Sequence, residues 1–143
     1  MRRRRAVAGT AFKHRLRVRY SECDLQGVVF NGNYVAYFDV VITELWREAL
    51  GPYQEMVDAG TDMVVAEINV RFLAPAGFDD EIDFEARITR LGETAMSTRI
   101  DGATRGEQVV AGELRHVFID PATKMKRPMP ENVRAALEPY LED

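Results

Sequence analysis

One stretch, residues 31–51, most constrains the fold of this chain, because it predicts a long helix that is apolar around most of its circumference. Asn31, Gly32 and Asn33 favour a helix start, and Gly51-Pro52 favours a helix end. Between these signals the apolar and aromatic side chains are Tyr34, Val35, Tyr37, Phe38, Val40, Val41, Ile42, Leu45 and Trp46. A surface helix needs only one apolar stripe, so the rest of the chain has to enclose this one.

The remaining sequence predicts about five antiparallel strands. Residues 13–20 alternate between arginines and mostly apolar residues, which is typical of a half-buried strand. Further strand-like runs span 63–73, 81–91, 95–101 and 108–119, and helical patterns span 54–59 and 131–141. Short turns between long strands indicate antiparallel pairing. We therefore expect an α+β fold in which a five-stranded antiparallel sheet wraps around a long central helix.

Length and charge limit the classes of function. The 143 residues fit one domain, expected over 13–143 after a flexible basic tail at 1–12, and a chain of this size favours oligomerisation. The net charge of −4 argues against nucleic-acid binding, so the arginine run at 2–5 predicts a solvated tail rather than a phosphate contact. A single cysteine and the lack of a membrane-length apolar run lead us to expect a cytoplasmic protein without membrane contact.

The candidate chemistry centres on Asp24, which stands in a turn shortly before the expected helix start. Backbone N–H groups at a helix start have no partner within the helix and carry partial positive charge, so they can bind a polarised carbonyl. A carboxylate beside such donors suggests acyl chemistry, although aspartate also favours a simple turn cap. Cys23 has no basic partner in the sequence, and His14 and His116 show no ligand-like spacing, so no metal site is expected.

Several segments carry a family resemblance that spans most of the chain. They are Val18–Asp24, Gly27–Phe30, Asn33-Tyr34, Phe72–Ala76, Asp79–Glu81 and Ile119–Pro121. In these segments the chain resembles the hot-dog fold thioesterases, specifically the branch of 4-hydroxybenzoyl-CoA thioesterase and the short-chain acyl-CoA thioesterases. The resemblance implies a sheet wrapped around a central helix, a homodimer with a continuous sheet and interfacial active sites, and often a dimer of dimers.

The resemblance also implies roles for individual residues. Asp24 falls on the family's catalytic aspartate, Asn31 on the position whose backbone N–H binds the thioester carbonyl, and Gly27 in the turn between them. Many acyl-CoA relatives have histidine at the position of Asn31, a departure that leaves the backbone donor intact. Asp39 falls where the 4-hydroxybenzoyl enzyme has an acid near the substrate's ring hydroxyl.

Further substrate contacts are expected from Tyr34 and from Glu67, which could line the site from the partner strand. The alternative for Glu67 is an exposed or interface position on its strand. The family's coenzyme A phosphate-binding residues fall at 91–93, where this chain has no match. The candidates for phosphate binding are therefore Arg90, Lys124, Lys126 and Arg127. No cofactor is expected, because coenzyme A is part of the substrate.

The leading hypothesis is an acyl-CoA thioesterase. Because a thiol with a pKa near 8.5 leaves readily, one carboxylate suffices, with Asp24 acting either as nucleophile or as general base. A first alternative is a thioesterase that acts on acyl carrier protein, which would dock on the arginines of the first strand or on the loop 124–127. A second is a non-catalytic acyl-CoA-binding module on the same scaffold. A hydratase is disfavoured, since the loop lacks a histidine beside Asp24.

Overall fold

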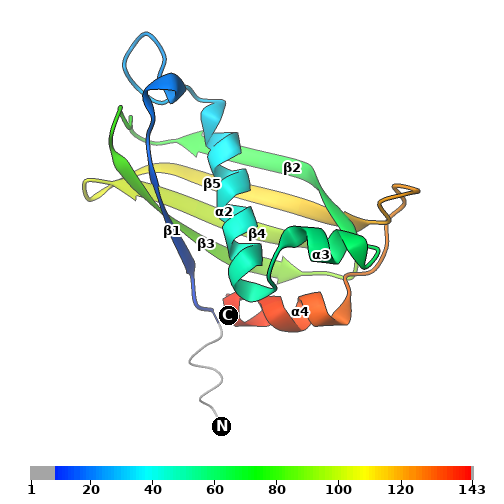
Figure 1. Cartoon of the computed structure of the whole chain (residues 1–143). Coiled ribbons are helices and arrows are strands. Elements are labelled where there is room, and N and C mark those ends of the chain that lie inside the picture. Colours follow the sequence, from blue (N-terminus) through cyan, green and yellow to red (C-terminus); the bar gives the residue numbers. More distant parts are fainter. Residues whose placement is uncertain (1–8, 143) are drawn as a thin grey trace.

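In the computed structural model, which describes residues 9–142, one long helix lies across a five-stranded sheet (Figure 1). The strands are β1 (Phe12–Arg17), β2 (Asp62–Phe72), β3 (Glu81–Leu91), β4 (Ala95–Thr104) and β5 (Glu107–Ile119). The helices are η1 (Tyr20–Glu22), α2 (Asn33–Ala49), α3 (Tyr53–Asp58), α4 (Glu131–Leu137) and η2 (Glu138–Tyr140). Most of the expected basic tail, residues 1–8, lies outside the described residues.

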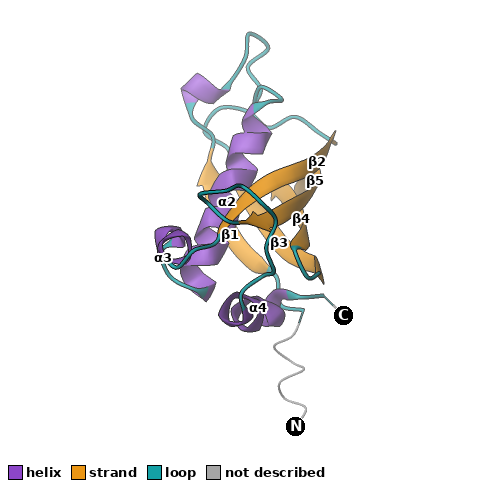
Figure 2. Cartoon of the chain, turned by 90° about the vertical axis from the view of Figure 1, so that its right-hand side faces the viewer, coloured by secondary structure: helices purple, strands orange, loops and turns teal. Residues whose placement is uncertain are grey.

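The sheet has the order β1-β3-β4-β5-β2, and every neighbouring pair is antiparallel. Figure 2 shows that α2 lies against one side of the curved sheet. The core forms between them, where Phe38, Leu45 and Trp46 are fully buried. Within residues 9–142, no helix has both the length and the apolar character needed to span a bilayer. The fold class predicted from the sequence is confirmed.

Gly112 on β5 allows α2 to approach the sheet closely. A Cβ atom at this position would lie 2.5 Å from Cε2 of Phe38, closer than any real contact. Phe38 itself packs edge-on against Phe84 of β3, with ring centroids 6.2 Å apart. Any side chain at position 112 would therefore push Phe38, and with it α2, away from the sheet.

Three element boundaries predicted from the sequence are wrong. β1 ends at Arg17 rather than near residue 20, because the Val18 N–H bonds to the Asp80 carbonyl at 2.8 Å and the chain then turns into η1. β4 continues past Gly102 to a tight turn at Arg105 and Gly106, where both φ angles are positive. The C-terminal helix ends at Leu137, since Pro139 follows and the chain tightens into η2.

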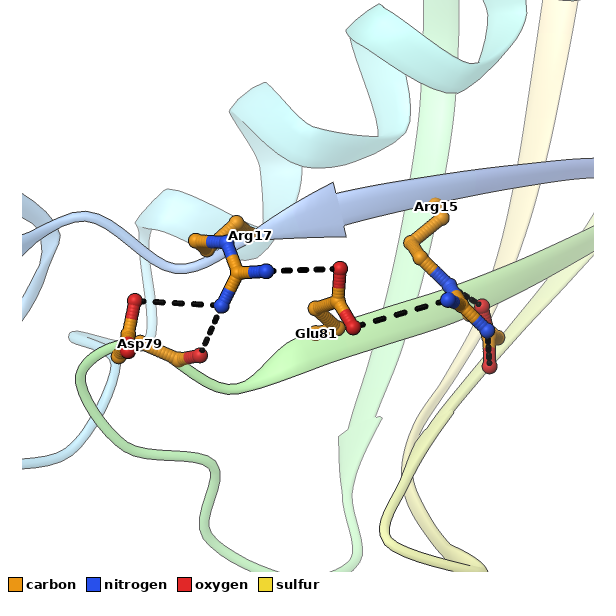
Figure 3. Close-up of polar contacts among 5 residues, drawn as sticks. Arg15, Arg17, Asp79 and Glu81 are labelled. Atoms are coloured by element: carbon orange, nitrogen blue, oxygen red, sulfur yellow. Dashed lines mark hydrogen bonds and ion pairs between the residues drawn. The ribbon is translucent and has the colours of Figure 1, made fainter.

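The outer side of β1 is tied to β3 by ion pairs (Figure 3). Arg15 Nε lies 2.6 Å from Asp83 Oδ1, and Arg17 contacts Glu81 Oε2 at 2.9 Å and Asp79 Oδ1 at 3.2 Å. These side chains are solvent-exposed, so the pairs contribute little to stability. Their main effect is on surface charge, because the acidic partners neutralise the positive charges of Arg15 and Arg17.

Candidate active site

Asp24 is held by its own turn in a way that leaves part of its carboxylate free. Its backbone N–H donates to the Val28 carbonyl at 2.9 Å, and Gly27, at a φ of 79°, donates back to the Asp24 carbonyl at 2.9 Å. Oδ1 accepts the Gln26 N–H at 2.8 Å, whereas Oδ2 accepts no hydrogen bond within residues 9–142. Asp24 can therefore both cap its turn and act as a reactive carboxylate. The hydrogen bond from Gln26 occupies only one of its two oxygens, and the side chain is exposed.

The loop that carries Asp24 is fixed on both sides by backbone contacts. Cys23 and Val29 form an antiparallel bridge across its base, and Val28 forms another with Gly77. The N–H of Val29, a residue only 3% exposed, also donates to the Ala76 carbonyl at 2.8 Å. The loop is thus attached to the segment before β3, which limits the positions its carboxylate can take.

Glu22 joins this loop to α2. Its carboxylate accepts hydrogen bonds from the Arg19 backbone N–H and from the Tyr37 hydroxyl, both at 2.8 Å, and its carbonyl accepts from the Asn33 side chain at 2.7 Å. Burial raises the pKa of Glu22, but the hydrogen bonds from Arg19 and Tyr37 outweigh that effect, so its pKa lies below the usual value. Sequence reasoning missed Glu22 and Tyr37 as positioning residues, although Glu22 lies in a segment that carries the resemblance.

The start of α2 presents free backbone donors. Within the described chain, neither the Asn31 nor the Gly32 N–H donates a hydrogen bond, and no side chain caps the helix. The Asn31 carbonyl accepts from the Tyr34 N–H at 3.2 Å, which closes the first turn. Two unpaired donors at the positive end of a helix can bind an oxyanion.

Beside Asp24 lies an open hollow of about 680 Å³ with largely apolar walls. Gly27 and Cys23 line it together with Tyr20, Leu25 and Phe78, whereas Asn31 does not. The Tyr20 and Phe78 rings meet edge to face, with centroids 5.9 Å apart. The structure therefore brings Asp24 and Gly27 together at an exposed apolar surface.

The predicted substrate-binding residues are more scattered. Tyr34 is buried near the start of α2, where burial and the Asp80 charge raise its pKa to about 12. Asp39 is exposed further along the same helix. Glu67 lies on the outer face of β2, 4.0 Å from Arg115, on the side of the sheet away from α2. Within one chain, Glu67 does not join Asp24.

The predicted coenzyme-binding residues also lie away from Asp24. The loop 120–127 (orange) is at the opposite end of the sheet from the Asp24 loop, near the start of β2 (Figure 1). Lys124 and Lys126 are exposed there, while Arg127 turns inward and donates to the Gly60 carbonyl. Arg90 is exposed near the end of β3. Among residues 9–142, no cluster of three or more histidine, cysteine or acidic side chains is arranged to hold a metal.

A curved antiparallel sheet with one long helix packed against it is the arrangement of the hot-dog fold. The matching family and the relatives place the chain among the thioester hydrolases. The chain belongs to the thioesterase superfamily, whose family model matches residues 26–123. This membership confirms the resemblance inferred from the sequence.

Individual relatives agree with this assignment. The chain is 29% identical over 128 residues to "Acyl-CoA thioester hydrolase YbgC" from Escherichia coli O6:H1, covering 88% of this chain and 95% of that protein. A thioesterase superfamily structure from Jannaschia sp. CCS1 has a TM-score of 0.88 at 25% identity, covering 94% of this chain and 95% of that one. Hypothetical protein TT1821 from Thermus thermophilus has a TM-score of 0.84 at 26% identity, covering 92% and 98%.

Proposed function

We propose that this chain is an acyl-CoA thioesterase that uses Asp24 to hydrolyse a thioester to a carboxylic acid and free coenzyme A. The observation that carries the proposal is the carboxylate of Asp24, fixed by its loop before the start of α2 yet with one oxygen unbonded, in a chain of the thioesterase superfamily. The relative YbgC, named an acyl-CoA thioester hydrolase, supports coenzyme A as the acyl carrier.

The chemistry follows from these groups. Asp24 either attacks the thioester carbonyl to form a mixed anhydride, which water then cleaves, or removes a proton from the attacking water. In both routes the C–S bond breaks, one water is consumed, and the thiolate takes up a proton. The Asn31 and Gly32 N–H groups would bind the oxyanion, and losing one such donor typically costs about 10²- to 10³-fold in rate.

We further propose that the enzyme is a homodimer joined through β2. Antiparallel β2 is an edge strand of 11 residues, and the large apolar side chains exposed on it and just beyond it are Val64, Val65, Phe72 and Leu73. A long apolar edge promotes association unless it is covered. Pairing with β2 of a second copy would cover it and extend the sheet.

Such a pairing would also bring the missing coenzyme contacts to the site. Two antiparallel β2 strands would place the start of one beside the end of the other. The end of β2 lies near the start of α2, where Phe72 packs against Tyr34 with ring centroids 5.9 Å apart. The start of β2 pairs with the end of β5, which bridges to Lys126. We therefore propose that Lys124 and Lys126 of the partner subunit bind the coenzyme A phosphates at each site.

The acyl carrier protein alternative keeps only part of its predicted docking surface. Arg15 and Arg17 of β1 are paired with acidic residues of the 79–83 segment, so they offer no free positive charge. Lys124 and Lys126 are exposed and form no ion pair within the described residues. Coenzyme A and acyl carrier protein would therefore bind the same loop, so activity measurements with each kind of substrate have to distinguish the two hypotheses.

The test is release of free thiol from acetyl-, hexanoyl-, palmitoyl-, benzoyl- and 4-hydroxybenzoyl-CoA, with Asp24→Asn compared with wild type. Asp58→Asn is the matched control, because Asp58 is an exposed aspartate on α3. We expect at least one acyl-CoA to turn over and Asp24→Asn to lower kcat by about 10²-fold or more, with the control unchanged. Equal rates in wild type and Asp24→Asn would refute the assignment. Turnover of acyl carrier protein substrates alone would favour that alternative, and no turnover at all would favour a binding module.

A further inference from the structure

A cavity of about 240 Å³, partly open to solvent, lies at the C-terminal end of α2 and is lined by residues of α3 and of the segment 127–133. Its lining includes Trp46, Leu50, Met56, Thr61, Arg127 and Val133. Trp46 stands roughly 20 Å along α2 from the helix start beside the Asp24 loop, at 1.5 Å per residue. The cavity is therefore separate from the proposed active site.

Two buried N–H groups in the lining lack a hydrogen-bond acceptor. Trp46 is fully buried, and neither its Nε1 nor the Nε of Arg127 has a partner within the described residues. Arg127 donates from another nitrogen to the Gly60 carbonyl, but no carboxylate lies within 4.0 Å of it in residues 9–142. Buried donors are normally paired, so these groups indicate a site for an acceptor.

The chemistry of the lining selects the kind of acceptor. The Arg127 guanidinium has an unbonded Nε and only a longer-range interaction with the Asp120 carboxylate, so it favours an anion. The Leu50, Met56 and Val133 side chains favour an apolar portion on the same molecule. Glu55 also lines the cavity and is itself negatively charged, which disfavours ions with more than one charge. A dry cavity of about 150 Å³ holds benzene, so this one is large enough for a single small organic acid.

We propose that this cavity binds a small monocarboxylate with a short apolar chain, its carboxylate accepting from Trp46 Nε1 and Arg127 Nε. The proposal does not depend on hydrolysis by Asp24. Such an acid belongs to the same chemical class as the acid that a thioesterase releases.

Trp46 is the only tryptophan of the chain and so reports binding directly. The experiment is a fluorescence titration of the full chain with sodium butyrate, alongside sodium chloride and inorganic phosphate at matched ionic strength. We expect a saturable change with butyrate and none with the two inorganic ions. Arg127→Met should weaken butyrate binding by about tenfold or more, because it removes a charge-assisted hydrogen bond. Arg47→Gln is the matched control, since Arg47 is exposed, follows Trp46 and does not line the cavity.

A second variant tests the cavity without disturbing the Arg127 contact with Gly60. Ala59 is exposed and lines the cavity, so Ala59→Leu should obstruct it and abolish the butyrate response. The proposal fails if butyrate produces no saturable change, if chloride or phosphate binds as well as butyrate, or if Arg127→Met and Ala59→Leu both bind butyrate like wild type.

Discussion

Acidification should destabilise this protein through one buried histidine. His116 lies on β5 with 4% of its surface exposed, opposite Met96 of β4 and Val65 of β2, and its Nδ1 has no partner within the described residues. Burial lowers the pKa of His116 to about 4, because the charged imidazolium is poorly solvated among these neighbours.

The sign and size of the effect follow from linkage. In the unfolded chain a histidine titrates near 6.5, so between pH 6.5 and pH 4 the unfolded state binds more protons than the folded state. The stability contribution is complete above pH 6.5 and is lost as the pH falls toward the folded pKa of about 4. A difference of roughly 2.5 pKa units corresponds to about 3 kcal/mol in the free energy of unfolding.

The assay is urea unfolding at a series of pH values from 4 to 7.5, on wild type and His116→Leu. Carboxylates also titrate over part of this range, so the informative quantity is the difference between the two slopes. His116→Leu should show a shallower fall in stability than wild type between pH 6.5 and 4. Parallel curves for wild type and His116→Leu would show that His116 is not held neutral by burial.

Three further predictions concern the helix, the loop and the sheet edge. Gly112→Ala should lower the free energy of unfolding by about 1–3 kcal/mol, measured in urea, because the new methyl group would overlap Phe38. Tyr37→Phe should cost about 1 kcal/mol in thermal or urea unfolding and lower kcat, because Glu22 loses the donor that ties the Asp24 loop to α2; an unchanged kcat would remove Tyr37 from loop positioning. If the proposed dimer forms through β2, Val65→Lys should convert it to a monomer in analytical ultracentrifugation.

The features predicted correctly from the sequence are those set by local pattern. The apolar residues of 34–46 predict a buried helix, and one face of α2 is buried against the sheet. The prediction that the helix is enclosed all round is wrong for one chain, because Val35 and Val40 on its other face are exposed. The alternation of Leu114, His116 and Phe118 also indicates burial of the histidine on the inner face, although that burial was not among the predictions made from the sequence. Such periodicities need no knowledge of distant contacts.

Features that depend on distant contacts could not be predicted. Alternation places Val65 and Glu67 on the same face of β2, but the register shifts between them at a bulge around Ala66, so Glu67 points outward. The hydrogen bond from Tyr37 to Glu22 joins α2 to the loop before it, whereas the sequence pattern indicates only that Tyr37 is one of the apolar or aromatic residues of the helix. The position of Lys124 relative to Asp24 depends on the path of the whole sheet, and in the proposed dimer on a second chain.

Because Asp24 is exposed in one chain, its proposed role in hydrolysis depends on whether a second copy pairs along β2. In one chain the carboxylate lies beside an open hollow, with the neighbouring Tyr20, Leu25 and Phe78 all exposed. Water at such a surface screens the interaction between an oxyanion and the amides at the start of α2, so these donors contribute far less than in a closed site. A second copy paired along β2 would exclude water near the end of that strand. A monomeric Val65→Lys variant should therefore keep its fold, measured by circular dichroism, yet lose most of its thioesterase activity; a fully active monomer would show that one chain forms the complete site.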